Sequence, residues 1–307
     1  MVEQLISSNA TLAFIPFFLL FVVLEMLAVR VFRAKGSVDV KDDGVSVFLG
    51  MMSAVMNGFA AFLTIGALYW AAQYQLFDVP MTFAMLALCF VLDDFRFYLH
   101  HRIAHRVRWV WAMHFVHHSS NRFSFAVALR QPWTKHFSGT MMLKLPLVML
   151  GFDPLMVIFC GAVNAIYQFF LHTQTIGLLP RWYEFIFNTP SHHRVHHGRN
   201  PQYLDANYAG TLIIWDRLLG TFAREEEKVD FGLVSPLTSL NPVRILLTEY
   251  WATFKDISQR GISLSQRLAY LLGPPGWSHD GSRLSSLDIK REAGLLEDEA
   301  PKPVAAE

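Results

Sequence analysis

The sequence is poor in cysteine, which removes several classes of site from consideration. Only Cys89 and Cys160 occur in 307 residues, and each lies inside an apolar run. Two isolated apolar thiols exclude a disulfide framework, a paired-cysteine redox motif and a cysteine-based zinc site. Any metal chemistry of this chain must therefore use other ligands.

An excess of charge of one sign is also missing. The formal net charge is +1, from 26 Lys and Arg against 25 Asp and Glu, and no acidic or basic tail stands out. This balance gives no reason to expect a nucleic-acid partner. The chain also lacks a glycine-rich dinucleotide motif, a phosphate-binding loop and an iron–sulfur cysteine pattern, so electrons for a redox reaction must come from a separate donor.

Apolar residues, in contrast, are abundant, with 53% hydrophobic residues and 26 Phe, which indicates an integral membrane protein. Residues 10–29 form a run with Glu25 as its only acidic residue, long enough to cross about 30 Å of hydrocarbon. Because this run lacks the basic start and the small-residue cleavage site of a signal peptide, we expect a retained anchor. Further spans are expected at residues 45–70 and 80–92.

Two more apolar runs, residues 136–150 and 154–171, are joined by Gly-Phe-Asp-Pro, which is a turn signal. Each run is short for a full crossing, so we expect a tilted or partly inserted hairpin. The sequence therefore predicts an all-α integral membrane protein with about four to five membrane-embedded helices, including this hairpin, and a cytosolic histidine-rich metal cap.

We expect four regions along the chain. An anchor helix and basic loop occupy residues 1–43, and a catalytic membrane domain occupies residues 44–225. An amphipathic segment over residues 226–278 suits the membrane interface. A polar, mobile tail follows over residues 279–307.

Basic residues after the first span predict the orientation. Arg30, Arg33, Lys35 and Lys41 follow that span, whereas residues 1–9 contain no Lys or Arg. The excess of basic residues places this loop in the cytoplasm. Two further crossings bring the histidines to the same side, so we expect an active site on the cytoplasmic face of a bacterial inner membrane, or of the endoplasmic reticulum in a eukaryote.

Histidine spacing is the main functional signal. Residues three and four apart share one helix face, so each short group of histidines points one way. Imidazole suits iron, zinc, copper and nickel, and eight or more ligands are too many for one ion, so we expect a two-metal centre. Eleven of the thirteen histidines lie in these groups: His100, His101, His105, His114, His117, His118, His172, His192, His193, His196 and His197.

The residues around the histidines narrow the metal and the ligand set. No Glu lies within the motifs, as it does in His-Glu-x-x-His zinc hydrolases, so two iron ions that activate O₂ fit better than hydrolytic zinc. His100 points about 100° away from His101 and is expected outside the site. His192, four residues before His196, is left open as a ligand. His136 and His279 are expected to be hydrogen-bonded or interfacial residues.

Several residues near the motifs are candidates for supporting roles. Asp94 lies on the same helical stripe as Tyr98, His101 and His105, about two turns from His101, so it can orient a ligand from another helix or, alternatively, simply meet solvent at a helix end. Tyr98 and Asn207 are further candidates to support the ligands. A second set contacts substrate or reductant, or else anchors the cap at the interface: Arg130, Gln131 and Trp133.

At these residues the sequence resembles the fatty acid hydroxylase/sterol desaturase superfamily. The resemblance covers residues 85–225. It rests on Asp94 and Tyr98 before His-Arg-x-x-His, on His-x-x-His-His-Ser-Ser, and on the run Asn-Thr-Pro-Ser-His-His-Arg-Val-His-His-Gly-Arg-Asn of residues 188–200. Within the superfamily the chain is most similar to the alkylglycerol monooxygenase family, through Ala-Leu-Arg-Gln at 128–131, Tyr-Gln-Phe-x-x-His-Thr at 167–173 and Asn-Tyr-Ala-Gly at 207–210.

The resemblance implies a ligand set and an activity. The implied ligands are His101, His105, His114, His117, His118, His193, His196 and His197, with His172 and His192 as additional candidates. The implied activity is hydroxylation of a membrane lipid by O₂ at two iron ions, including cleavage of alkylglycerol ethers, with electrons from a reduced pterin or another external donor. Alternatives are a desaturase or a hydroxylase of a sterol, sphingolipid, aminolipid or carotenoid. A metal transporter is a more distant alternative, since the histidines flank the spans instead of lying within them.

Overall fold

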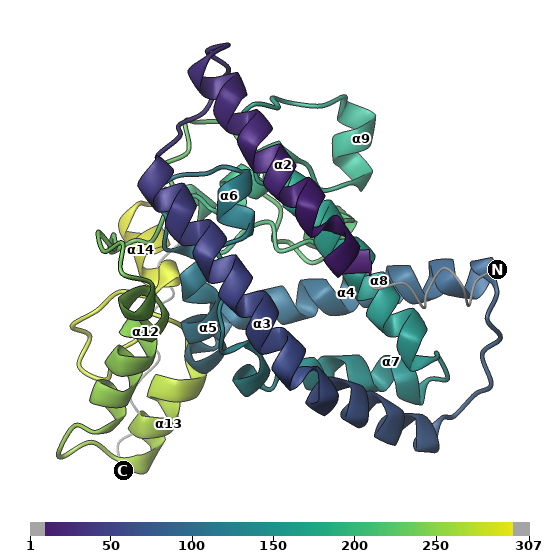
Figure 1. Cartoon of the computed structure of the whole chain (residues 1–307). Coiled ribbons are helices and arrows are strands. Elements are labelled where there is room, and N and C mark those ends of the chain that lie inside the picture. Colours follow the sequence, from purple (N-terminus) through teal and green to yellow (C-terminus); the bar gives the residue numbers. More distant parts are fainter. Residues whose placement is uncertain (1–9, 297–307) are drawn as a thin grey trace.

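The computed structural model describes residues 10–296, and this part of the chain is built from helices (Figure 1). The four longest are α2 (Ala10–Arg30), α3 (Val40–Ala71), α4 (Phe83–Arg106) and α8 (Pro154–Leu171). The other α-helices are α5 (Arg108–His118), α6 (Phe125–Ala128), α7 (Leu145–Met149), α9 (Arg181–Ile186), α10 (Pro190–His196), α11 (Ile214–Leu218), α12 (Pro242–Ile257), α13 (Leu264–Leu272) and α14 (Ser286–Glu292). The 3₁₀ turns are η1 (Ala72–Tyr74), η2 (Lys135–Ser138), η3 (Thr140–Lys144) and η4 (Pro201–Tyr203). Extended pairing in residues 10–296 is limited to two isolated bridges, so the all-α prediction is confirmed.

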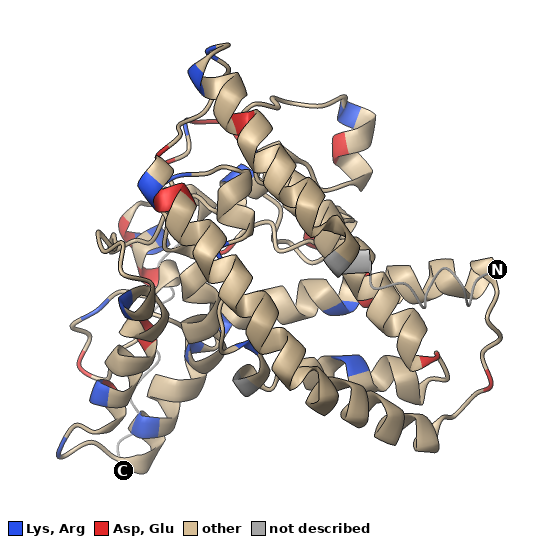
Figure 2. Ribbon diagram, in the orientation of Figure 1, with Lys and Arg blue, Asp and Glu red and all other residues tan. Residues whose placement is uncertain are grey.

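Three helical segments among the described residues are long and apolar enough to cross a membrane: Ala13–Arg30, Val40–Tyr74 and Pro154–Leu171. Lys, Arg, Asp and Glu are sparse along the middle of α2 and α3 and gather near their ends and on the shorter helices (Figure 2). The number of apolar helices roughly agrees with the expectation from the sequence, but two details differ. The expected span at residues 80–92 is only the first part of α4, and α4 is not among these three segments.

The predicted hairpin is the second difference, because its first half is not one continuous helix whereas its second half is. Residues 136–150 break into η2, η3 and α7, with Gly139 in the left-handed region (φ +77°) between the two 3₁₀ turns. The second half is one continuous helix of 18 residues, α8, and is long enough to cross. Its start is well defined: Pro154 occupies the first turn, and the Asp153 carboxylate accepts from the Leu155 amide at 2.7 Å.

Helix α4 is the central element, since it contacts both α8 and α5. Its first half packs into an apolar core with α7 and α8 that includes Leu86, Cys89, Val148 and Val157. A second apolar cluster joins α2 to α6 and α8 through Phe18, Phe125 and Phe169, all buried. The membrane-length helices therefore hold α4 along one half and leave its C-terminal half for the histidine-bearing segments.

A corner between α4 and α5 sets the relative direction of these segments. Val107, the one residue between the two helices, is extended, with φ −119° and ψ 113°. The Arg108 amide donates to the Gly273 carbonyl at 3.0 Å, and its guanidinium pairs with Glu249 at 2.8 Å and Asp256 at 2.6 Å. The chain after α11 therefore fixes the corner, which no glycine or proline in the local sequence marks.

The C-terminal region agrees only in part with its sequence interpretation. Helix α12 exposes Val243, Leu247 and Trp251 on one side, which fits the interfacial segment that we predicted and still propose. The expected mobile tail contains α14, which begins with a capping box between Ser285 and Asp288. The remainder of that tail, residues 297–307, lies outside the described residues.

Candidate metal centre

Four helices bring nine histidines to one place. Helix α4 carries His101 and His105, and α5 returns after the corner with His114, His117 and His118. His172 caps the C-terminal end of α8, while His193 and His196 lie in α10 and His197 caps that helix. Helix α10 begins where the sequence indicates a helix start, since Pro190 follows Thr189, whose hydroxyl accepts from the His192 amide.

The nine side chains form two groups. Within each group one ring nitrogen of every residue lies within 4.8 Å of those of the other members. The five-histidine group contains His101, His105, His114, His118 and His196, and the four-histidine group contains His117, His172, His193 and His197. The two groups are neighbours, because the rings of His118 and His197 stack at a centroid distance of 4.3 Å.

The nitrogen spacing fits metal coordination. In the five-histidine group, Nε2 of His114 lies 2.9 Å from Nε2 of His101 and 3.0 Å from Nε2 of His118. In the four-histidine group, Nε2 of His172 lies 3.1 Å from Nε2 of His117 and 3.0 Å from Nε2 of His193. Adjacent ligands about 2.0–2.1 Å from one ion are about 3 Å apart, so the rings converge as ligands of a common ion do. The Nε2 atoms of His105, His196 and His197 are buried without a hydrogen-bond partner among the described residues, as expected of further ligand atoms.

Backbone carbonyls orient three of the rings through their other nitrogen. Nδ1 of His101 lies 2.8 Å from the Tyr208 carbonyl, Nδ1 of His172 lies 2.8 Å from the Gln168 carbonyl, and Nδ1 of His196 lies 3.0 Å from the Ala206 carbonyl. A carbonyl can only accept, so these nitrogens carry the proton and leave Nε2 unprotonated for a metal.

The rings are held in their neutral, ligand-competent form. Burial, reinforced by neighbouring histidines, lowers the pKa of His117 to about 4. The same causes hold the pKa well below the ordinary value for His101, His114, His118, His172, His193, His196 and His197. A divalent metal competes with protons for these nitrogens, so neutrality at physiological pH favours binding.

Asp94 contacts the histidines only indirectly, through the loop that faces His101. Its carboxylate is fully buried and accepts four hydrogen bonds, from the amides of Thr211 and Leu212, the side-chain amide of Asn164 and the indole of Trp215. These bonds fasten the loop whose Tyr208 carbonyl faces His101. Asp94 therefore does not meet solvent, and its position suits an indirect role in orienting a ligand.

Neither Tyr98 nor Asn207 forms a hydrogen bond with any of the nine histidine rings in the described part of the chain. The Tyr98 hydroxyl lies 3.0 Å from the Thr221 hydroxyl and accepts from Arg102 at 3.2 Å. Asn207 adopts a left-handed backbone (φ +55°) and donates to the carbonyls of His192 and Ala223. Both residues thus hold the loops that surround the centre.

Two histidines of the sequence motifs lie outside both groups. His192 packs its ring against Phe222 at 5.3 Å, so we leave it out of the candidate ligand set. His192 and His193 both lie in α10, where adjacent side chains point about 100° apart, so only His193 faces the centre. His100 lies outside as expected, and its Nε2 is buried without a partner among the described residues.

The candidates for substrate or reductant contact have protein partners. Arg130, only 1% exposed, donates to Ser119, Ser46 and Asp42. Gln131 donates to the Ala128 carbonyl and Trp133 to the Leu49 carbonyl. The contacts of Arg130 and Trp133 join the start of α3 to the segment after α5, whereas that of Gln131 stays within the segment, so a role in packing fits all three side chains.

Two carboxylates near the centre were missed by the motif analysis. Asp205 lies 3.7 Å from Nδ1 of His105 and 3.5 Å from Arg106, and no sequence signal marks it. Glu25 of α2 accepts from the Phe125 amide at 2.6 Å and from the hydroxyl of Thr173, which follows His172. Its signal was present, since an acidic residue inside an apolar span is costly unless it has a role.

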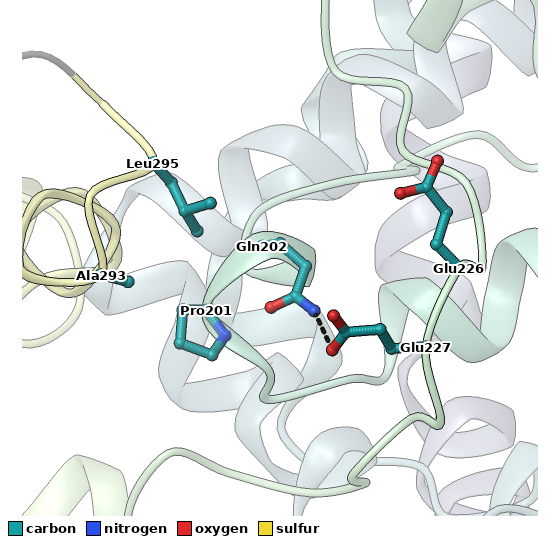
Figure 3. Close-up of a pocket in the computed structure, with 6 residues that line it drawn as sticks. All are labelled: Pro201, Gln202, Glu226, Glu227, Ala293 and Leu295. Atoms are coloured by element: carbon teal, nitrogen blue, oxygen red, sulfur yellow. Dashed lines mark hydrogen bonds between the residues drawn. The ribbon is translucent and has the colours of Figure 1, made fainter.

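The surface cavity in Figure 3 is separate from the histidines. Its volume is about 340 Å³, and it lies between η4, the loop that carries two glutamates and the end of the described chain. The residues that line it are Pro201, Gln202, Glu226, Glu227, Ala293 and Leu295.

The chain is similar to several known lipid-modifying enzymes. Residues 86–221 match the fatty acid hydroxylase family model. The chain is 35% identical to alkylglycerol monooxygenase of Danio rerio over 285 residues, which is 91% of this chain and 62% of that protein. It is 34% identical to the Homo sapiens alkylglycerol monooxygenase over 88% of this chain and 60% of that protein. It is 31% identical to ornithine lipid hydroxylase OlsE of Rhizobium tropici over 50% of this chain and 44% of that protein. The chain thus spans about three fifths of the length of these alkylglycerol monooxygenases. No solved structure matches it significantly.

Proposed function

We propose that the protein is a membrane-bound monooxygenase that uses two iron ions and O₂ to hydroxylate a lipid C–H bond, and the match of residues 86–221 to the fatty acid hydroxylase family model supports this. The observation that carries this proposal is the convergence of nine buried or half-buried histidines into two adjoining groups beside an apolar helical bundle. An all-imidazole site of this kind suits redox-active iron better than a carboxylate-dependent zinc hydrolase.

The two histidine groups would each hold one ion. Bound iron would supply the activation of O₂ and the removal of hydrogen from carbon. The residues of this chain supply position, because the carbonyls of Tyr208, Gln168 and Ala206 fix three ligand rings. They also exclude water, because Phe123 covers the four-histidine group, with its ring stacked on His172 at 5.5 Å and on Phe231 at 5.1 Å.

The names of the relatives support one class of substrate. The proteins named alkylglycerol monooxygenase support an ether lipid as substrate. Insertion of one oxygen atom into the C–H bond next to the ether oxygen gives a hemiacetal, which separates into a fatty aldehyde and glycerol. The second oxygen atom leaves as water with two protons and two electrons, supplied by a reduced pterin or another external donor. By the distribution of basic residues, the reaction takes place on the cytoplasmic face.

Aldehyde release tests this proposal. Membranes that contain the protein receive an alkylglycerol, a reductant and iron, and the fatty aldehyde is measured by mass spectrometry with and without O₂. We expect release only with O₂ and iron, and loss of release in His117→Ala but not in His279→Gln, a histidine outside both groups. Full activity of the His117 variant, or aldehyde formation without O₂, would contradict the proposal.

A hydroxylase of another lipid is the second candidate, and the similarity to an ornithine lipid hydroxylase favours it. Hydroxylation and desaturation begin with the same hydrogen removal, so the histidine groups suit both. A comparison of lipids from cells with and without the gene separates these outcomes. A lipid that gains one oxygen indicates hydroxylation, and one that loses two hydrogens indicates desaturation.

A further inference from the structure

The outer side of α12 carries an exposed apolar stripe. Four large apolar side chains, spaced three and four residues apart, lie on one side of this helix: Val243, Leu247, Trp251 and Phe254. The neighbouring helix α13 repeats the pattern with three exposed leucines, Leu264, Leu268 and Leu272. Single exposed apolar residues are ordinary on a protein surface, but a stripe that continues over two packed helices marks an interaction site.

The charged residues of α12 are divided between its two sides. Both acidic residues face inward, where Glu249 and Asp256 pair with Arg108 at 2.8 Å and 2.6 Å. Arg244 and Lys255 are exposed, and neither side chain forms an ion pair or a hydrogen bond among residues 10–296. Around the helix these two lie about 65–85° from the centre of the apolar stripe, whereas the two carboxylates lie about 155–175° from it. The outer side is therefore apolar with a basic border.

This outer side continues the exposed apolar surface of α3, a helix long enough to cross a membrane. Ile245 and Leu246 of α12 are buried against Leu49 of α3, and α3 exposes Phe48 and Met51 near this contact. Helix α12 has 16 residues, about 24 Å, which is too short to cross the hydrocarbon. In Figure 1 the pair of α12 and α13 projects away from α3 instead of running alongside it. A short helix that leaves a span in this way fits the membrane surface.

A groove on the outer side joins the basic border to the apolar stripe. Its volume is about 490 Å³, within the range of ordinary ligand sites. The residues that line it are Asn241, Val243, Arg244, Leu247, Thr248 and Trp251. The lining thus combines the Arg244 guanidinium with apolar side chains, and an amphiphile with a negative headgroup matches both.

We infer that the outer side of α12 and α13 docks on the membrane surface and binds an anionic phospholipid there, with the lipid phosphate at Arg244 and an acyl chain along Leu247 and Trp251. The apolar stripe enters the boundary between headgroups and acyl chains, and the basic border attracts anionic headgroups. The inner side of α12 holds Arg108 at the corner between α4 and α5, so the docked helix also fixes the direction of the histidine-bearing helix α5. The inference goes beyond an interfacial position, because it assigns a headgroup charge and a residue that binds it. It does not depend on the proposed reaction.

Lipid binding is measured without turnover. The full chain in neutral detergent is titrated with phosphatidylglycerol and, separately, with phosphatidylcholine, and native mass spectrometry counts the lipids bound per chain. We expect tighter binding of phosphatidylglycerol. Arg244→Gln combined with Lys255→Gln should weaken that binding about 30-fold, because each basic residue near an anionic headgroup contributes about 5-fold.

A charge-matched control and the oligomeric state complete this test. Arg224→Gln combined with Lys228→Gln changes two exposed basic residues of the loop before α12 and should leave lipid binding unchanged. Equal affinity for the two lipids, or an equal loss in the control, would overturn the inference. So would a dimer whose formation excludes the lipid, since a second copy of the chain would then cover this side.

A spin label tests the position of α12 in the membrane. Leu247→Cys and Lys228→Cys each receive one nitroxide label, while Cys89 and Cys160 are buried and stay unlabelled. In bilayer discs of phosphatidylcholine and phosphatidylglycerol, oxygen dissolved in lipid should relax the label at 247, and a water-soluble nickel chelate should relax the label at 228. A label at 247 that meets the nickel chelate as freely as the label at 228 would contradict docking on the membrane.

Discussion

The two histidine groups are similar in composition but differ in how the fold holds them. In the five-histidine group, the rings of His101 and His196 are hydrogen-bonded to backbone carbonyls of the loop at residues 206–208. Asp94 and Asp216 hold the adjoining backbone, because their carboxylates accept from amides of residues 208–212. In the four-histidine group, His172 ends a membrane-length helix, and Glu25 of another such helix holds the residue that follows it. A network of loops therefore positions one group, and the bundle of membrane-length helices positions the other.

Removal of one ligand from each group is the strongest test of this comparison. His196→Ala and His193→Ala should each lower activity by about 100-fold or more, because loss of a ligand exceeds the 10–100-fold cost of losing a supporting contact. Elemental analysis should show loss of about one iron per chain in each variant, and the double variant should retain none. Loss of both ions in either single variant would show that the groups form one cooperative unit.

Acid should affect both groups alike. Burial lowers the folded-state pKa of His117 to about 4, below the unfolded value near 6.5, so the unfolded state takes up protons first. The metal-free protein should therefore keep this contribution above pH 6.5 and lose it as the pH falls toward 4, by about 3 kcal/mol for this residue. Urea unfolding of the metal-free protein at several pH values measures the effect. Stability that rises as the pH falls through this range would show that these rings do not fold in the neutral form.

The loop network has its own test in Asp94→Asn. The asparagine amide faces amide and indole donors, so at least one buried donor is left without an acceptor, at a cost of about 2 kcal/mol. We expect a lower melting temperature and a weaker iron affinity in the five-histidine group, with the four-histidine group less affected. Metal release during a chelator titration measures the two affinities. Equal weakening of both ions would remove the distinction between the groups.

The contact from α2 should produce the smallest effect. Glu25→Gln keeps a side-chain oxygen and the shape of the residue, so we expect about a 10-fold loss of iron affinity in the four-histidine group only. Glu25→Ala should have a larger effect, and Glu3→Gln outside the described residues serves as an acidic control. A change in the five-histidine group upon Glu25→Gln would contradict the assignment of each group to its own support.

The ligand groups could be predicted because helical spacing alone places His101 near His105 and His114 near His118. The sequence could not separate His192 from His193, since a single residue decides which side of α10 faces the centre. It could not show Asp205 either, because that carboxylate meets His105 only through the fold.

The corner at Val107 could not be predicted from the local sequence, because Arg108 is held by Gly273, Glu249 and Asp256, all far away in the sequence. The predicted run 154–171 has the bounds of α8, but it was judged short for a crossing, whereas its 18 residues are long and apolar enough to cross.

The corner at Val107 also has a consequence for biosynthesis. Its anchors at Glu249, Asp256 and Gly273 leave the ribosome long after His118, and at 5–20 residues per second the delay is about 7–30 s. During that interval the histidines of α4 and α5 are already synthesised, but the contacts that fix the corner between the two helices are not yet available. The C-terminal helices α12 and α13 would therefore be the last part of the chain to fix α5 in its position. A chain truncated before residue 249 should insert into the membrane but assemble its metal centre poorly.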